Sequence, residues 1–324
     1  RPLYEMLGYH LGLDGNDGQR GKRMRPLLGL LAYQSLTGDY RAALPGAAAV
    51  ELGHNFSLVH DDIEDADAER RHRPTLWAVW GVPLAINAGD ALFALSRLAL
   101  YRLLDGGFSE RRVLALMRVY DETCLALCEG QYLDISFERR TDVSVEAYLE
   151  MIGKKTAALV GASVQAGAIL ATDDGEVVEA YRRFGYDLGM AFQMSDDVKG
   201  SFWAASETGK PEAGDVRKRK KTLPLVWALE HASTPERDRL VEIYAPDARA
   251  TGNGHAAAIT PDAPLGDAEV AEVLDILERS GAREHTLIEA RRYRDAALRH
   301  LELLPCAPDR KRDLAALVRS VIPA

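Results

Sequence analysis

Three acidic residues in the first quarter of the chain have the spacing expected of a metal site. Asp61, Asp62 and Asp65 form the sequence DDIED at the end of an apolar run. Residues four apart share one face of a helix, so Asp61 and Asp65 can present carboxylates to the same point. Carboxylates without cysteine or clustered histidine suit a hard cation such as Mg²⁺, which keeps several waters and accepts diphosphate oxygens. An acidic, solvated helix end is the alternative for this motif alone.

A second acidic pair, Asp196 and Asp197, also follows a mainly apolar stretch, GMAFQMS. On two helices of one bundle, the two acidic groups could face each other and hold several Mg²⁺ ions around one diphosphate. Adjacent aspartates are common on protein surfaces, so the second pair gains weight because it repeats the first.

Basic residues stand in short segments around these acids. Arginine can bind a phosphate through two parallel hydrogen bonds, and lysine binds it as a point charge. Taken singly, each basic residue could instead form a structural salt bridge or an exposed charge. The candidates are Lys22 and Arg25 in GKRMRP, Arg70 and Arg71 in ERRHRPT, Lys155 in GKKTAAL, and Lys210 and Lys220 in TGKPEAGDVRKRKKTLP.

Long helices must position these groups. Apolar residues recur every three or four positions over long stretches, as in Val113, Leu116 and Tyr120, whereas alternating strand patterns are nearly absent. The predicted fold class is therefore all-α. The pattern predicts helices at 24–37, 43–66, 84–104, 110–136, 145–171, 175–200, 222–231, 234–244, 268–280 and 283–303.

The composition is that of a globular protein with a sizeable core. The chain has 324 residues, of which 47% are hydrophobic and 27% charged, and its length allows one domain or two. The net charge of −9 argues against nucleic-acid binding as the main function. Three scattered cysteines, Cys124, Cys128 and Cys306, are too few for a disulfide framework, so a reducing cytoplasm is the simplest compartment.

Two stretches have unusual compositions. Residues 156–172 are uncharged, but they fall short of the roughly 20 apolar residues that span a bilayer, so they predict a buried helix. Residues 245–266 are rich in Ala, Gly, Pro and Asp without helical periodicity, which predicts a mobile surface insertion. The sequence opens without the pattern of a secretory signal, and because Arg1 is not Met we expect the natural start upstream.

Taken in order, these segments resemble the trans-isoprenyl diphosphate synthase, or polyprenyl synthetase, family. VELGHNFSLVHDDIEDADAERRHRPT is similar to the first aspartate-rich region of that family with its RRGxPT extension. FQMSDD is similar to the FQxxDD that begins the second region, and GKPEAGDVRKRKKTLP is similar to GKxxGxDLxxGKxTLP. The resemblance implies one isoprenoid synthase domain over residues 1–324, built as a helical bundle around a central apolar cavity. It also implies a homodimer.

The resemblance implies that an allylic diphosphate (dimethylallyl, geranyl or farnesyl) is joined to isopentenyl diphosphate. The residues implied for isopentenyl diphosphate are Lys22, Arg25, His54 and Arg71. Those implied for the allylic diphosphate are Arg70, Lys155 and Lys210, with Lys220 near the mouth. Three Mg²⁺ ions, with Mn²⁺ as a substitute, would be bound by Asp61, Asp65 and Asp196 and supported by Asp62 and Asp197. Thr156 and Gln193 match polar positions that line the reaction site.

Three positions depart from the family pattern. Gly200 replaces the final aspartate of the second region, His72 stands where the RRG glycine is usual, and Trp77 stands where histidine is frequent. These departures leave open a non-catalytic subunit of a heteromeric synthase. A terpene cyclase is a further alternative, but it has only one diphosphate to hold.

The length of the product depends on how far the growing chain extends down the bundle. Phe56 and Ser57 precede Asp61 by about one helical turn, so both would project below the metal site, with Phe56 as the floor. One aromatic, a small neighbour and no insertion in DDIED resemble geranylgeranyl (C20) diphosphate synthases. Farnesyl (C15) or longer-chain synthases are the alternatives, and Phe56 could instead be a core aromatic.

Overall fold

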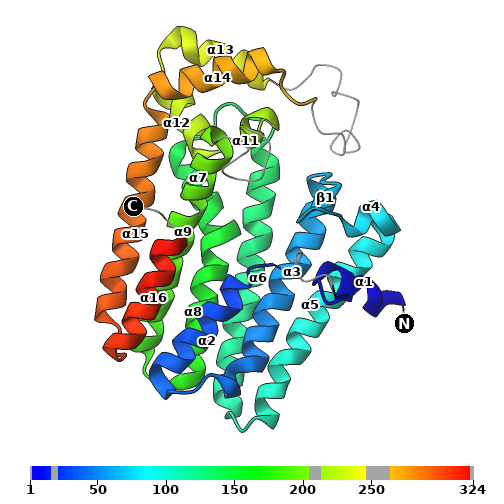
Figure 1. The fold of residues 1–324 in the computed structure, drawn as a ribbon, viewed down its shortest axis with the longest axis vertical. Helices are drawn as coiled ribbons and strands as arrows, with labels where there is room; N and C mark the ends of the chain where they lie inside the picture. Colours follow the sequence, from blue (N-terminus) through cyan, green and yellow to red (C-terminus); the bar gives the residue numbers. More distant parts are fainter. Residues whose placement is uncertain (1, 16–20, 204–212, 246–262, 322–324) are drawn as a thin grey trace.

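The computed structural model describes residues 2–15, 21–203, 213–245 and 263–321, and they form a bundle of long helices (Figure 1). The long helices are α2 (Met24–Thr37), α3 (Leu44–Glu64), α5 (Val82–Asp105), α6 (Glu110–Phe137), α8 (Ala158–Ala171), α9 (Gly175–Phe202) and α15 (Ala282–Leu303). The shorter ones are α1 (Pro2–His10), α4 (Leu76–Trp80), α7 (Val145–Ile152), α11 (Gly214–Arg217), α12 (Leu223–His231), α13 (Thr234–Tyr244), α14 (Asp267–Arg279) and α16 (Pro308–Val321). The predicted all-α fold class is confirmed.

Three further elements complete the described chain. A 3₁₀ turn at Arg41–Ala43 precedes α3, and a π-helical segment at Gly153–Ala157 joins α7 to α8. Between α3 and α4, β1 (Glu69–Arg70) and β2 (Arg73–Pro74) pair as an antiparallel hairpin.

The long helices pack side by side and share a core. Helix α3 packs against α5, α8 lies between α2 and α9, and α15 covers α9 (Figure 1). Helices α13 and α14 lie across one end of the bundle, above α12 in the figure. Tyr181 and Phe184 of α9 are fully buried in this core. The C-terminal halves of α3 and α9, which carry the two acidic groups, therefore run within one packed bundle.

Close helix packing depends on small residues in α8. A Cβ added to Gly167 would lie 2.2 Å from the backbone oxygen of Gly29 in α2, so the two backbones meet there without intervening side chains. A Cβ on Gly185 of α9 would lie 2.9 Å from Cα of Gly161. The small residues of α8 thus serve contacts inside the bundle.

Several elements differ from the sequence prediction. The structure adds α1, α4, α11, α16 and the hairpin, which the predicted ranges do not include. The predicted helix at 145–171 is helical throughout, but residues Gly153–Ala157 are π-helical. Most of the predicted insertion at 245–266 lies outside the described residues, while its end is anchored because Leu265 is buried and donates its N–H to the oxygen of Arg217 (2.9 Å).

In the described part of the chain, none of the helices combines the length and apolar character needed to cross a membrane.

Candidate active site

The first acidic group lies at the C-terminal end of α3, where the hairpin folds back over it. Arg70 in β1 donates from Nε to Oδ1 of Asp62 at 2.5 Å, and its Nη2 lies 3.5 Å from Oδ2 of Asp61. Burial raises the pKa of Asp62 to about 6, although the charge of Arg70 opposes this shift. The sequence placed Arg70 near the acids only by family resemblance, and the structure brings them into contact.

Lys155 approaches the same acids from the opposite side. Its Nζ lies 3.4 Å from Oδ1 of Asp61 and 2.5 Å from Oδ2 of Asp134 in α6. Burial disfavours its charge, but Asp134 and Asp61 outweigh that effect and raise the pKa of Lys155 above its usual value. The approach needs Gly130, because a Cβ there would lie 2.3 Å from the backbone nitrogen of Lys155. The lysine sits in the π-helical segment, a feature that often marks functional sites.

The segment between α11 and α12 brings two more cations to these acids. Nζ of Lys220 lies 3.8 Å from Oδ2 of Asp65, and Nζ of Lys218 lies 2.6 Å from Oδ1 of Asp67. Burial and the charge of Asp61 raise the pKa of Asp65 above its usual value. The position of Lys220 at the mouth of the site stays a prediction.

The second acidic group lies near the end of α9. Asp197 is buried and accepts hydrogen bonds from Tyr148 Oη (2.5 Å), Gln193 Nε2 (3.0 Å) and the N–H of Leu223 (3.1 Å). Thr156 in turn donates to Oε1 of Gln193 at 2.9 Å. Burial raises the pKa of Asp197 to about 7 despite these donors. Asp197 is therefore held rigidly, whereas its neighbour Asp196 is only partly buried.

A group of cationic and imidazole side chains lies beside the acids. Nη1 of Arg25 in α2 donates to Nε2 of His54 in α3 at 3.1 Å, so the histidine accepts at that nitrogen. Burial, followed by the charge of Arg25, lowers the pKa of His54 well below its usual value. A Cβ on Gly21 would lie 2.8 Å from Nη2 of Arg71, which places the residue before Lys22 against that guanidinium.

Two buried nitrogen atoms of this group have no hydrogen-bond partner among the described residues. Burial lowers the pKa of Arg25 to about 10, and among the described residues its buried Nε has no hydrogen-bond partner. Burial and the charges of Arg71 and Arg70 lower the pKa of His10 to about 3, and its buried Nε2 likewise lacks a partner in the described chain. The unpaired buried donor of Arg25, with further arginines nearby, suits an anionic ligand.

The acidic groups fit Mg²⁺ as their ligand chemistry suggested. They offer carboxylate oxygens, the donors that Mg²⁺ prefers. Within the described residues, no three acidic, histidine or cysteine side chains converge as a complete metal site. That arrangement suits an ion held by one or two carboxylates, with water and phosphate oxygens completing its coordination. Asp61, Asp65 and Asp196 are the residues that would hold the metal.

Several contacts in the site were not anticipated from the sequence. Asp134 and Gln131 lie three residues apart on α6, and Gln131 donates to Oε2 of Glu64 at 2.8 Å. Their spacing on one helical face was the available signal. Tyr148 and His10 carried no such signal, because their roles depend on tertiary packing. Lys210 lies outside the described residues.

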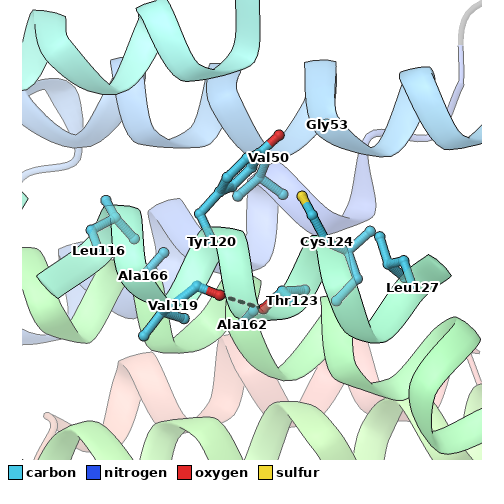
Figure 2. A pocket seen from close by; sticks show the side chains of 11 residues that line it. Val50, Gly53, Leu116, Val119, Tyr120, Thr123, Cys124, Leu127, Ala162 and Ala166 are labelled. Atoms are coloured by element: carbon cyan, nitrogen blue, oxygen red, sulfur yellow. Dashed lines mark hydrogen bonds between the residues drawn. The ribbon is translucent and has the colours of Figure 1, made fainter. Parts of the chain in front are cut away.

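An apolar cavity lies between α3, α6 and α8 (Figure 2). Figure 2 shows the ring of Tyr120 reaching from α6 toward Val50 and Gly53 of α3. Its hydroxyl lies 2.5 Å from Oγ of Ser96 in α5, and a Cβ on Gly53 would lie 2.2 Å from that hydroxyl. The residues that line the cavity are Val50, Gly53, Leu116, Val119, Tyr120, Thr123, Cys124, Leu127, Leu159, Ala162 and Ala166.

The predicted floor residue, Phe56, is not among the residues that line this cavity. Its ring instead packs edge-on against Phe93 of α5, with ring centroids 5.1 Å apart. The ring of Phe93 stacks on the ring of Tyr120, with ring centroids 6.5 Å apart. Phe56 thus supports the aromatic side chain that faces the cavity. Ser57 donates to the backbone oxygen of His54 (2.8 Å).

Two of the three departures from the family pattern lie in or beside the hairpin. His72 has φ 60°, in the left-handed region that glycine adopts without strain, which explains why glycine suits this position. Arg71 also has a positive φ, of 54°. Trp77 donates from its indole nitrogen to the backbone oxygen of Asp67 at 2.9 Å, so it braces the segment that follows the first acidic group.

Comparisons with known proteins identify the family of the chain. The polyprenyl synthetase family matches residues 12–259. A (2E,6E)-farnesyl diphosphate synthase of Mycobacterium tuberculosis is 40% identical over 293 residues, covering 89% of this chain and 77% of the relative. A geranylgeranyl diphosphate synthase of the same organism is 44% identical over 237 residues, covering 72% of this chain and 67% of the relative.

A solved structure gives the same result for the fold. The geranylgeranyl pyrophosphate synthetase of Pyrococcus horikoshii superposes with a TM-score of 0.86 at 34% identity, over 99% of this chain and 90% of that chain. The helical bundle thus recurs in a solved structure that matches this chain along most of its length. The chain belongs to the polyprenyl synthetase family.

Proposed function

We propose that this protein is a Mg²⁺-dependent prenyltransferase that joins an allylic diphosphate to isopentenyl diphosphate head to tail, with geranylgeranyl diphosphate (C20) as its main product. The observation that carries this proposal is that cationic side chains form two separate groups of contacts. One combines Asp61 with Arg70 and Lys155, and the other combines Arg25 with His54. Two diphosphates could therefore be held side by side.

The metal supplies the electrostatic part of the reaction. When bound, Mg²⁺ neutralises the charge that develops on the departing diphosphate. Asp61, Asp65 and Asp196 would hold the metal, and oxygens of the diphosphate would complete its coordination. We propose three ions, and Mn²⁺ as a substitute, because α3 and α9 each end in a group of acids.

The chain's own residues would then direct the remaining chemistry. Arg70 and Lys155 would donate hydrogen bonds to the allylic diphosphate, so that the allylic C–O bond breaks and the electron pair leaves with the diphosphate. Arg25, His54 and Arg71 would hold isopentenyl diphosphate, whose double bond attacks the allylic carbon. The new C–C bond forms, and a proton is lost to the departed diphosphate. Apolar side chains of α3, α6 and α8 would surround the hydrocarbon tail and exclude water from the allylic cation.

The arrangement also bears on the alternative functions. A terpene cyclase needs one diphosphate site, and the Arg25–His54 group would then have no ligand. A non-catalytic subunit would not need the contacts of Lys155 and Arg70 with Asp61. Both features favour a catalytic synthase.

The aromatic contacts below the first acidic group favour a medium-length product. Tyr120 faces the cavity, and Phe93 and Phe56 pack behind it in sequence. We propose that these three rings together limit the chain to C20. Farnesyl diphosphate is the alternative, since relatives of both names match this chain.

A homodimer is consistent with the outer surface of α5 and α6. Both helices expose large apolar side chains there, and contiguous exposed apolar surface often marks a protein interface. The exposed fractions are 58% for Leu98, 49% for Tyr101, 64% for Leu114, 62% for Leu125 and 72% for Tyr132. We propose that a second copy of the chain covers this surface.

Product analysis tests the proposed function. The purified protein is incubated with Mg²⁺, labelled isopentenyl diphosphate and each allylic primer in turn, and the products are separated by chain length. The proposal expects linear diphosphates with C20 dominant. Cyclic hydrocarbons would indicate a cyclase, and no product with any primer would indicate a non-catalytic subunit.

A further inference from the structure

The hairpin that carries Arg70 and Arg71 closes through a strained turn. Arg71 and His72 connect β1 to β2, and both have positive φ, of 54° and 60°. Such tight turns favour glycine or asparagine, because other side chains clash with the backbone in the left-handed region. Two consecutive residues of this kind persist only where the surrounding structure holds them. Contacts outside the turn must therefore keep it closed.

Each strand of the hairpin is held by a different element. In β1, Nε of Arg70 donates to Oδ1 of Asp62 in α3 at 2.5 Å. In β2, Nη2 of Arg73 donates to Oδ2 of Asp14, just after α1, at 2.6 Å. Nη1 of Arg73 donates to Oδ1 of Asp14 and to the backbone oxygen of Tyr9 in α1, both at 3.3 Å. We call the contacts of Arg73 with Tyr9 and Asp14 the clasp.

The clasp is more than an exposed ion pair. The guanidinium of Arg73 stacks over the ring of Tyr9, with Cζ 3.7 Å from the ring centroid, and only 12% of the Arg73 side chain is exposed. Oη of Tyr9 also donates to the backbone oxygen of Pro74 at 3.0 Å. Helix α1 is itself anchored, because Met6 and Leu7 are buried. Two parallel hydrogen bonds and a cation–π contact give the clasp a defined geometry.

The two arginines of the turn region differ in how they are held. The side chain of Arg70 has its own ion pair with Asp62. The side chain of Arg71 forms no hydrogen bond or ion pair with another of the described residues, and it lies against Gly21, where an added Cβ would be 2.8 Å from Nη2. The backbone of the turn therefore sets the direction of Arg71 more than that of Arg70.

We propose that Arg73 is a positioning residue: through the clasp, α1 holds the strained turn so that Arg71 points toward the diphosphate of isopentenyl diphosphate. The inference rests on the proposed function, in which Arg71 binds that substrate. It also explains how the turn tolerates His72, since α1 supplies the restraint that a histidine in this conformation needs. Loss of the clasp should weaken binding of isopentenyl diphosphate and leave the allylic substrate, held by Arg70 and Lys155, largely unaffected.

Two other roles for Arg73 give different results. If the clasp only stabilises α1, its loss lowers Tm without changing substrate affinity. If Arg73 acts only through its positive charge near an anionic ligand, removing the negative charge of Asp14 should tighten binding. Positioning predicts the opposite sign for Asp14, because losing either partner frees the turn. It also predicts that glycine at position 72, which adopts positive φ without strain, makes the clasp less necessary.

The test measures binding of isopentenyl diphosphate by isothermal titration calorimetry, with Mg²⁺ and without an allylic primer, so that no turnover occurs. The variants are Arg73→Ala, Asp14→Ala, His72→Gly and the double variant His72→Gly/Arg73→Ala. Arg112→Ala is the matched control, because Arg112 forms a similar pair with Asp173 (3.1 and 3.4 Å) and donates to the backbone oxygen of Leu170. Steady-state KM for each substrate and circular dichroism accompany the titrations.

The inference predicts that Arg73→Ala raises Kd and KM for isopentenyl diphosphate by about tenfold and Asp14→Ala by about threefold or more, while KM for the allylic primer changes by less than about twofold. The double variant should bind within about threefold of His72→Gly alone, and Arg112→Ala should match wild type. Because Asp14→Ala leaves the hairpin sequence intact, it decides the question if Arg73→Ala does not fold.

Unchanged Kd in the clasp variants, or tighter binding by Asp14→Ala, would overturn the inference and leave the proposed function intact. The same holds if His72→Gly restores none of the affinity lost in Arg73→Ala, or if Arg112→Ala weakens binding equally. A wild-type protein that neither binds isopentenyl diphosphate nor forms product with any primer would contradict the proposed function, and the inference with it.

Discussion

Nζ of Lys155 lies 3.4 Å from Oδ1 of Asp61, although the two residues come from helical segments far apart in the sequence. Asp61 also contacts Arg70, and Lys155 also contacts Asp134. Cations and carboxylates therefore already meet where a metal and a diphosphate would bind. When both ligands are present, the lysine can turn its charge toward phosphate oxygens while the aspartate turns toward the metal.

The first prediction concerns this lysine. Lys155→Met should lower kcat/KM by about a hundredfold or more, because it removes a positioned donor to the departing diphosphate. The matched control is Lys154→Met, since Lys154 forms ion pairs with Glu129 and Glu150 and does not contact the site acids. Steady-state rates with a fixed allylic primer measure the difference. Equal losses in both variants would mean that the effect is structural.

The second prediction separates the two substrates. His54→Ala removes the acceptor that holds Nη1 of Arg25 and should raise KM for isopentenyl diphosphate by about tenfold, or about 1.4 kcal/mol. The KM for the allylic substrate should change little, because Arg70 and Lys155 contact the other group. Varying one substrate at a saturating concentration of the other measures each value. A larger effect on the allylic substrate would reverse the assignment of the two sites.

The third prediction follows from the pKa of Asp197, which burial raises to about 7. A folded-state pKa above the unfolded value means that its stabilising contribution is present below about pH 4 and is lost as pH rises toward 7. Asp197→Asn keeps the shape without the charge. Relative to wild type, the metal-free variant should therefore gain free energy of unfolding between about pH 4 and 7, by an amount of the order of 4 kcal/mol.

Chemical denaturation at several pH values, without metal, measures that gain. The amide can still accept from Tyr148 and Leu223, and Gln193 can turn its own amide to match. A difference between wild type and Asp197→Asn that is independent of pH would show that Asp197 does not titrate in this range.

The fourth prediction concerns product length. Tyr120→Ala should open the cavity and shift products beyond C20, while Tyr120→Phe keeps the ring and should leave the length unchanged. Phe56→Ala should shift products toward C25 by a smaller extent, because Phe56 reaches the cavity only through Phe93 and Tyr120. Chromatography of the dephosphorylated products measures chain length. An unchanged distribution in Tyr120→Ala would remove Tyr120 as the floor.

Much of the fold could be predicted from the sequence because long amphipathic helices leave a clear period. The helices that carry Asp61 and Asp196 were predicted to within a few residues of α3 and α9. The hairpin around Arg71 could not be predicted, since it depends on residues with positive φ that have no apolar pattern. Helix α4 is only five residues long, too short for its period to be read.

Some residues of the candidate site could be predicted from the sequence, and others could not. Residues in acidic or basic motifs, such as Asp61, Lys155 and Arg25, could be found from residue type and spacing. Asp134 could not, because a single acid in a helix acquires meaning only when packing brings it to the site. Phe56 was expected to form the floor of the cavity, but it is not among the residues that line it, and its ring packs against Phe93, a contact that sequence spacing does not specify.

The central claim is that Asp61 and the metal act together in joining two diphosphate substrates. The most direct measurement is a Mg²⁺ titration of labelled isopentenyl diphosphate incorporation into geranyl or farnesyl diphosphate, by wild type and by Asp61→Asn. The account predicts saturable Mg²⁺-dependent formation of C20 product by wild type and a loss of at least about a hundredfold in Asp61→Asn with the fold retained. Equal incorporation by the two proteins, or incorporation that persists in excess chelator, would contradict it.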